Sequence, residues 1–192
     1  MNSSKNSTIY DSLPPQISGK KLGQIHVKFP KIVRSDGKPN VGFRVKFEWW
    51  GQKSEPSILS IPWKSGHPIN EAIFPVRVDR GSLEGYFSDM ETLQMAIYDS
   101  DNTLFGLTSL PLIWLINNNL FFDGTLSVRG VGPLKNVKVA ELHVYVAVVY
   151  DETRRKKVKE LLEGKQTTNV DVFQRMEVCV VVSRPVLTCM IA

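Results

Sequence analysis

The sequence predicts an all-β protein, an eight-stranded antiparallel β-sandwich, from three observations. About eight short segments alternate apolar and polar residues with a period of two, which is typical of strands with one buried face. Clusters of Gly, Pro, Asn and Asp separate these segments at intervals near the ~8–12 residues found in sandwiches. No long amphipathic helix interrupts them. Two packed antiparallel sheets are the arrangement that buries one face of so many strands.

Composition favours one globular domain with tails. The chain has 192 residues, of which 42% are hydrophobic and 22% charged. Its net charge of +5 suits an acidic partner such as a tubulin surface, an anionic lipid or nucleic acid, but selects none of them. Among these partners we expect an anionic lipid or an acidic protein surface, and no nucleic acid. The two cysteines, Cys179 and Cys189, make no disulfide framework for the body of the chain and favour a reducing, intracellular compartment. We expect no signal peptide and no transmembrane segment, because no apolar stretch is long enough.

The first residues differ from the predicted domain, which we place at residues 20–152. Residues 1–19 are rich in Ser and Asn and close with Pro14-Pro15, so they are predicted to be a flexible leader. A first strand is expected over residues 22–29. Pro30 then marks a strand end, an edge position or a bulge. Residues 35–40 combine Asp-Gly with Pro-Asn and are predicted to turn the chain into the next strand.

The clearest strand pattern lies at residues 41–51, which we expect to form a central strand. The odd positions are apolar and are predicted to face the core, whereas the even positions are polar. Trp50 breaks this alternation by placing an indole on the polar side, and Gly51 ends the strand. The predicted core residues of this strand are Phe43, Val45, Phe47 and Trp49.

The later elements follow the same reasoning. Residues 85–90 are ambiguous between a short strand and one helical turn, residues 114–116 predict a short helical turn, and Asp123-Gly124 predicts a turn or bulge within a strand. The further strands are expected over residues 57–61, 72–78, 93–98, 105–112, 120–128 and 142–148.

Beyond the predicted sandwich, residues 153–192 are expected to form a charged helix and a poorly ordered tail. Asp151 and Glu152 precede the basic run at 154–157, an order that suits the helix dipole. The basic run indicates a nuclear signal, a lipid-binding patch or simply a solvated helix face. Residues 178–182 are an apolar run to which we assign no function.

The chain carries few residues that suggest catalysis. His26, His67 and His143 have no ligand or acid at the spacing of a metal site, so solvated histidines are expected. Neither a nucleophile elbow nor a phosphate-binding glycine loop is present in the sequence. We therefore expect no enzyme and no cofactor.

Two groups of charged residues suggest binding. Asp99 and Asp101 lie two residues apart at a strand end, where they could chelate Ca²⁺ or instead form a hydrophilic turn capped by Asx hydrogen bonds. The even-numbered residues Lys28, Arg44 and Lys46 could form a cationic sheet face for an anionic lipid or protein. Large exposed aromatics are common at binding hot spots, so Trp50 is the best single candidate for an interaction residue. The sequence also allows Trp50 to be covered by the leader, the loop at Trp63 or the helix expected at 151–163.

An eight-stranded sandwich with an Asp-x-Asp loop before Phe105-Gly106 resembles a C2 domain. A more particular resemblance is to the N-terminal C2 domain of the centriolar C2 domain-containing protein 3 family, over roughly residues 12–152. The most specific part is the strand Val-Lys-Phe-Glu-Trp-Trp-Gly at 45–51. The other matching features are Ser-Leu-Pro-Pro at 12–15, Tyr-Phe-Ser-Asp-Met at 86–90 with Leu93, Ile116-Asn117 before Leu-Phe-Phe at 120–122, and Glu141-Leu142.

This resemblance implies a non-enzymatic scaffold needed for centriole elongation, distal appendage assembly and cilium formation. Its implied partners are centriolar proteins, and its implied location is the cytoplasm and cytoskeleton, at the centrosome, the centriole and the basal body of the cilium. Asp36 takes the place of one calcium-loop aspartate, but Val41 and Gly42 stand where an aspartate and a proline are expected. With only Asp36, Asp99 and Asp101, too few oxygens remain, so binding is expected to be independent of calcium. Alternatives are a peripheral phosphoinositide-binding C2 domain of membrane traffic and a β-sandwich accessory domain of an enzyme.

Overall fold

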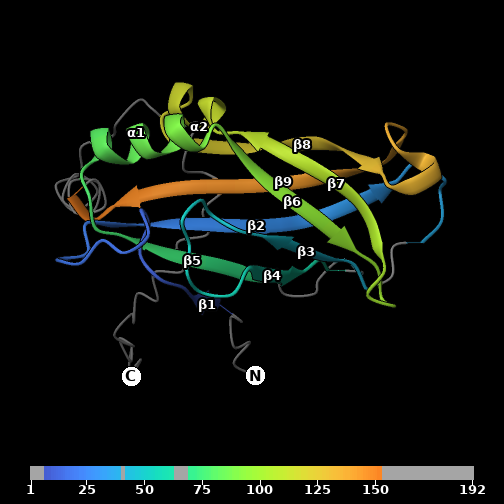
Figure 1. Ribbon diagram of the computed structural model, residues 1–192, viewed down its shortest axis with the longest axis horizontal. Coiled ribbons are helices and arrows are strands. Elements are labelled where there is room, and N and C mark those ends of the chain that lie inside the picture. Colours follow the sequence, from blue (N-terminus) through green and yellow to red (C-terminus); the bar gives the residue numbers. More distant parts are fainter. Residues whose placement is uncertain (1–6, 40–41, 63–68, 153–192) are drawn as a thin grey trace, which may run out of the picture. The chain divides into compact units, whose positions relative to one another are not determined.

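The computed structural model of the protein describes residues 7–39, 42–62 and 69–152 (Figure 1). Strands are the main secondary structure, and two short α-helices lie side by side along the sheet (Figure 1). The elements are β1 (Ser7–Ile9), β2 (Gly23–Arg34), β3 (Arg44–Phe47), β4 (Ser57–Ser60), β5 (Glu71–Val76), α1 (Arg80–Met90), β6 (Thr92–Tyr98), β7 (Leu104–Pro111), α2 (Ile113–Asn117), β8 (Phe121–Gly130), the 3₁₀ turn η1 (Gly132–Leu134) and β9 (Lys138–Tyr150).

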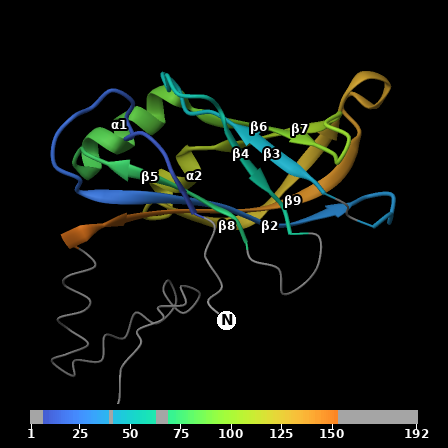
Figure 2. The same ribbon diagram turned by 90° about the horizontal axis from the view of Figure 1, so that it is seen from below.

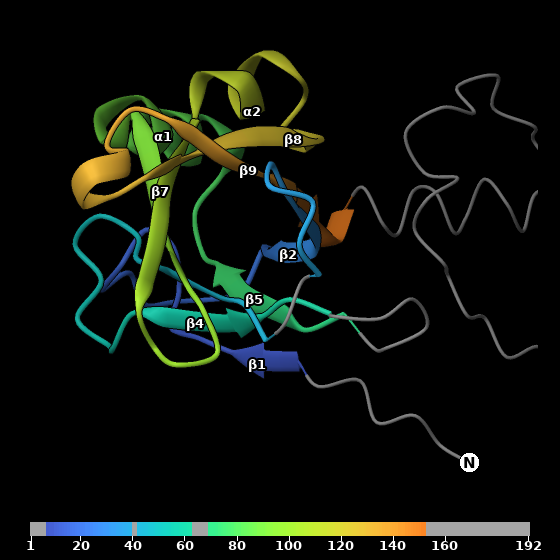
Figure 3. The same cartoon turned by 90° about the vertical axis from the view of Figure 1, so that its right-hand side faces the viewer.

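The strands form one hydrogen-bonded sheet that folds back on itself. Its order is β1-β5-β2-β9-β8-β7-β6-β3-β4. The pairing of β7 with β8 consists of two residue pairs, Gly106 with Gly130 and Leu107 with Arg129. At this corner the sheet turns over, so that β7-β6-β3-β4 cross in front of β5-β2-β9-β8 (Figures 1 and 3). The predicted eight-stranded antiparallel sandwich is therefore confirmed, and β1 adds a ninth strand.

Aromatic rings hold the two layers together. Phe29 of β2 meets Phe47 of β3 edge to face with ring centroids 5.6 Å apart. Phe47 also meets Phe74 of β5 at 6.2 Å, and Trp49 meets the same ring at 5.8 Å. Because these rings come from both layers, the core lies between the layers, as in other sandwiches.

The central prediction for residues 41–51 holds for the part that the structure describes. Phe43, Val45, Phe47 and Trp49 are all buried, with at most 2% of their surface exposed. The strand itself is shorter than predicted, because β3 ends at Phe47 and the chain then turns. β3 lies between β4 and β6 and so is not an edge strand, which agrees with its aromatic inner face.

The leader is more structured than its composition indicates. Ser7–Ile9 pair in parallel with Glu71–Ile73 of β5. Leu13 bridges to Val76 and is only 1% exposed. A short polar segment thus adds to an open sheet edge through its backbone, and backbone pairing leaves little trace in residue composition.

Two local predictions are wrong. Residues 80–90 form a helix of three turns, whereas the sequence suggested a strand or one turn within 85–90. Asp79 caps this helix by accepting the Ser82 N–H at 3.0 Å, and only Leu83 and Phe87 are buried, which is too sparse a pattern to recognise.

The second wrong prediction is the turn or bulge at Asp123-Gly124. Both residues pair regularly with β9, and the irregularity in β8 lies between Val128 and Arg129. Gly124 instead gives space to a ring, since a Cβ there would lie 2.9 Å from Cζ of Phe122. Pro30, by contrast, lies in a bulge of β2 between Lys28 and Lys31, one of the options that its position left open.

No helix in the described ranges is long and apolar enough to cross a membrane. The predicted short helical turn at 114–116 is confirmed as part of α2. The helix and tail expected at 153–192, the loop at Trp63 and His67 lie outside the described residues.

Candidate interaction surfaces

Trp50 projects from a tight turn. The Gln52 N–H donates to the Trp49 carbonyl at 3.0 Å, and Gly51 has φ = 76°, a conformation that glycine adopts without steric cost. This turn separates the two tryptophans, because Trp49 enters the core with 1% of its surface exposed whereas Trp50 is 60% exposed. The structure thus places Trp49 in the core and Trp50 at the surface, as predicted, although Trp50 belongs to a turn rather than to a strand.

The turn rests on α1, as Figure 2 shows for the loop after β3 and the end of this helix. The Trp50 indole stacks on the Tyr86 ring at 6.5 Å between centroids and 17° between planes. The Tyr86 hydroxyl donates to the Trp50 carbonyl at 2.8 Å, and the Trp50 N–H lies 3.5 Å from Sδ of Met90. Burial raises the pKa of the Tyr86 hydroxyl, so it stays a hydrogen-bond donor at neutral pH. We call Trp50, Tyr86 and Met90 the Trp50 platform.

The sequence left open whether other parts of the chain cover Trp50. The leader approaches the turn, since Cγ of Pro15 lies 3.8 Å from the position of a Cβ on Gly51. The indole nevertheless keeps most of its surface exposed. The leader therefore does not cover the Trp50 platform, whereas the loop at Trp63 and residues 153–163, the other two possible covers, lie outside the described residues.

The three predicted cationic residues do not share one face. Val45 and Phe47 are buried, so Arg44 and Lys46 point away from the core on the outer side of β3. Lys28 points outward from β2 in the opposite layer, where its Nζ lies 3.1 Å from Glu71 and 5.3 Å from the centroid of the Tyr145 ring. The proposed single cationic face is therefore wrong, because equal strand periodicity does not show to which layer each strand belongs.

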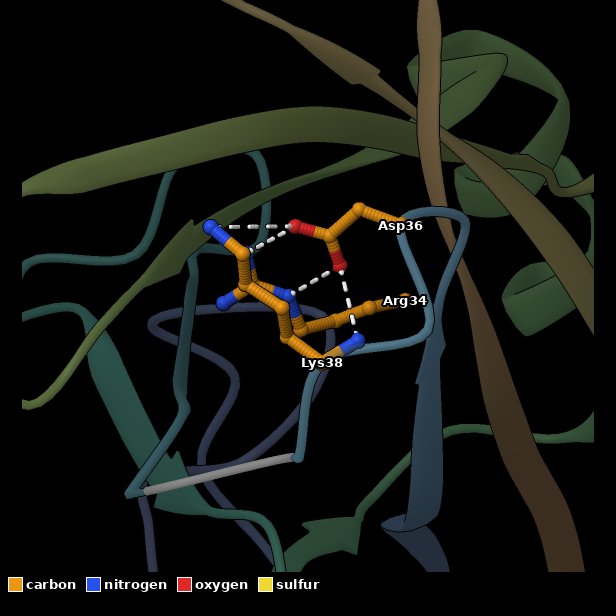
Figure 4. A network of polar contacts seen from close by, with 3 residues as sticks. All are labelled: Arg34, Asp36 and Lys38. Carbon is orange, nitrogen blue, oxygen red and sulfur yellow. Dashed lines mark hydrogen bonds and ion pairs between the residues drawn. The ribbon is translucent and has the colours of Figure 1, made fainter.

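Asp36 is engaged by basic groups of its own loop (Figure 4). Arg34 donates from Nε to Oδ1 at 2.8 Å and from Nη2 to Oδ2 at 2.5 Å, and the Lys38 N–H donates to Oδ1 at 3.2 Å. The bonds from Arg34 lower the pKa of Asp36 to about 2. Its carboxylate is thus already paired with a guanidinium.

Asp99 forms the Asx-type turn that was the alternative to a calcium site. Its Oδ1 accepts the N–H groups of Asp101 at 3.0 Å and Thr103 at 2.9 Å. The pKa of Arg34 is raised, mainly by the hydrogen bond to Asp36 and also by the negative charges of Asp36 and Asp99, whereas burial lowers it. The same guanidinium lies 5.3 Å from the Phe105 ring centroid. Arg34 therefore supplies a fixed positive charge between the two loops that would have to supply calcium ligands.

From this arrangement we expect no saturable binding of Ca²⁺ at micromolar concentration, because Arg34 repels a second cation and competes for Asp36. In the described part of the chain, no three His, Cys, Asp or Glu residues lie close enough to hold a metal ion. Calorimetric and thermal-shift titrations test this. A calcium-induced shift in melting temperature that disappears when Asp99→Asn and Asp101→Asn are combined would contradict the expectation.

Two histidines have acidic partners that the sequence analysis missed. His26 Nδ1 lies 2.8 Å from Oε1 of Glu71, and His143 Nε2 lies 2.6 Å from Oδ1 of Asp123. Each partner comes from a neighbouring strand, diagonally across the pairing register. The sequence separations, 45 and 20 residues, carry no such signal, and only a correct register could have revealed the pairs.

A family described as the N-terminal C2 domain of C2CD3 protein matches residues 10–152. Among solved structures, a C2 domain of plant Extended Synaptotagmin 1 is 17% identical with a TM-score of 0.43, and the match covers 69% of this chain and 98% of that one. A structure titled for CC2D1B and ESCRT-III activity at the nuclear envelope is 13% identical with a TM-score of 0.49, and covers 70% of this chain and 58% of the other.

A third solved structure, a C2 domain-containing protein from a putative elicitor-responsive gene, is 15% identical with a TM-score of 0.43 and covers 70% of this chain and 96% of that one. Comparison with curated protein sequences gave no significant match. The family match covers every strand from β2 to β9, beginning at the residue after β1 and ending two residues beyond β9. The chain therefore belongs to the family of the N-terminal C2 domain of C2CD3 protein.

Proposed function

We propose that the chain is a non-enzymatic interaction module of a centriolar or ciliary scaffold. The observation that carries this proposal is the family match over residues 10–152. The module would support centriole elongation, distal appendage assembly and cilium biogenesis by binding centriolar proteins. It would act in the cytoplasm and cytoskeleton, at the centrosome, the centriole and the basal body of the cilium.

The Trp50 platform is the surface that best suits such binding. An indole that is 60% exposed and already held by Tyr86 loses little conformational freedom when a partner covers it. Tryptophan is also enriched at the energetic centres of interfaces. Binding through this platform requires no cofactor and no catalytic group. We therefore propose Trp50 as the principal contact residue.

A second candidate function, peripheral binding to phosphoinositide membranes, is favoured by one observation on β3. Lys46 makes no ion pair within the described ranges and lies opposite Ile58 of β4, whose side chain is 54% exposed. A lysine beside an exposed apolar residue suits an anionic lipid surface. Arg44 on the same face, however, donates to Asn102 at 3.2 Å, and Lys28 lies in the other layer. Few cations thus converge there, and we place this function second.

Two assays test the proposal. The epitope-tagged chain should concentrate at centrioles in cells, and it should remain in the supernatant when sedimented with phosphoinositide-containing vesicles, because too few cations share one face. A matched pair of variants sharpens the lipid assay: Lys46→Glu removes the candidate lipid contact, and Lys38→Glu removes a lysine of the Asp36 loop. Sedimentation that Lys46→Glu abolishes and Lys38→Glu does not would favour the membrane function instead.

A further inference from the structure

The Trp50 platform is bordered by carboxylates. Glu48 precedes Trp50 by two residues, and Asp89 and Glu91 flank Met90 at the end of α1. All three side chains are exposed, and none makes an ion pair in the part of the chain that the structure describes. Lys53 is the one cationic residue of the adjoining turn and its flanks, 48–55. This acidic border contrasts with the net charge of +5 of the whole chain.

The acidic residues come from two separate elements. Glu48 directly follows β3, whereas Asp89 and Glu91 are the chain neighbours of Met90, whose Sδ lies 3.5 Å from the Trp50 nitrogen. A partner that covers the indole therefore has exposed carboxylates from both elements in its neighbourhood. Leaving these carboxylates uncompensated at an interface would cost affinity, so charge complementarity favours a basic partner.

Such a surface calls for a partner that carries an apolar residue with cationic residues beside it. An apolar residue with Lys or Arg three or four positions away on each side presents this pattern on one helical face. Met90 adds a flexible, polarisable side chain that adapts to different apolar partners.

We propose that the Trp50 platform, together with Glu48, Asp89 and Glu91, binds a basic amphipathic helix of a partner protein. The inference rests on the proposed function, because it names the chemistry of the partner that the interaction module takes. The apolar face of that helix covers the indole and the Met90 thioether. Its cationic side chains pair with the carboxylates of Glu48, Asp89 and Glu91.

The test is a titration of the full chain against a labelled synthetic helix built of leucine and lysine, followed by fluorescence anisotropy. A helix of leucine and glutamate serves as the control probe. We expect the chain to bind the basic helix and not the acidic one, and we expect added salt to weaken this binding. Trp50→Ala and the double variant Glu48→Lys/Asp89→Lys should each bind the basic helix about tenfold more weakly.

Two matched controls separate a specific site from general attraction. Trp114→Ala removes the other exposed tryptophan of the described chain, whose ring stacks on Phe122 with centroids 5.7 Å apart. The second control is the double variant Asp101→Lys/Glu141→Lys. It changes the net charge by the same amount as Glu48→Lys/Asp89→Lys. Both controls should bind like the original chain.

Equal weakening by the two charge-reversal variants would overturn the proposal, as would binding of the acidic helix or no binding of the basic one. Melting temperatures of all variants identify any loss that comes from unfolding. If the basic helix fails to bind while centriolar targeting still depends on Trp50, the partner chemistry is wrong and the proposed function stands. If the helix binds but the chain does not reach centrioles, the proposed function is wrong and the binding surface stands.

Discussion

Replacing Trp49 by alanine is expected to lower the free energy of unfolding by about 3–5 kcal/mol, the usual cost of deleting a large buried aromatic side chain. Trp50→Ala should cost only about 0.5–1.5 kcal/mol, the range of one aromatic stacking contact. Two adjacent residues of the same type thus differ severalfold in their contribution to stability. The reason is the turn at Gly51, which sends one indole into the core and the other toward solvent.

Trp49 has this large effect because it joins three elements. Its ring stacks on Phe87 of α1 at 5.8 Å and 22°, and meets Phe74 of β5 edge to face. Its backbone N–H also faces Oε1 of Gln52 at 3.2 Å, within the turn. Deleting the indole therefore opens a cavity where a helix, a strand and a turn meet, and such a site has little freedom to collapse.

Urea denaturation of the two variants measures the difference. Trp49→Phe is a useful intermediate, because phenylalanine keeps part of the stacking and removes the Nε1 donor, which is buried with no hydrogen-bond partner within the described residues. We expect its loss to be clearly smaller than that of Trp49→Ala. Equal losses for Trp49→Ala and Trp50→Ala would contradict the assignment of the two indoles to opposite sides of the turn.

The fold could be predicted from the sequence wherever burial follows a period of two. β3 and β9 show this most clearly, since alternate residues such as Val45 and Phe47, or Leu142 and Val144, face the core. The helix α1 escaped prediction because only Leu83 and Phe87 anchor it. β1 escaped because a short edge strand is held by its backbone.

The candidate sites were less predictable, because they depend on contacts between distant segments. An exposed Trp50 follows from alternation and a glycine, but its support by Tyr86 and Met90 depends on how α1 docks against the turn. Pairing of Arg34 with Asp36 lies within reach of local sequence reasoning, since the two residues are two positions apart. The approach of Asp99 to Arg34 requires the tertiary fold.

The central claim is that this sandwich acts by presenting a supported, accessible tryptophan to a centriolar partner. If it is correct, removing Trp50 removes the contact while leaving the core intact, because Trp49, Phe74 and Phe87 still pack together. Trp114→Ala is the matched control, since it also deletes an exposed, stacked indole, here on α2. Its partner Phe122 belongs to β8, whereas Trp50 stacks on Tyr86 of α1.

The most direct measurement is therefore the centriolar enrichment of the tagged chain and of the Trp50→Ala and Trp114→Ala variants, imaged in the same cells and paired with their melting temperatures. We expect Trp50→Ala to lose most of its enrichment while melting close to the original chain, and Trp114→Ala to keep its enrichment. A Trp50→Ala variant that melts early yet still concentrates at centrioles would show that Trp50 serves the fold and not the partner.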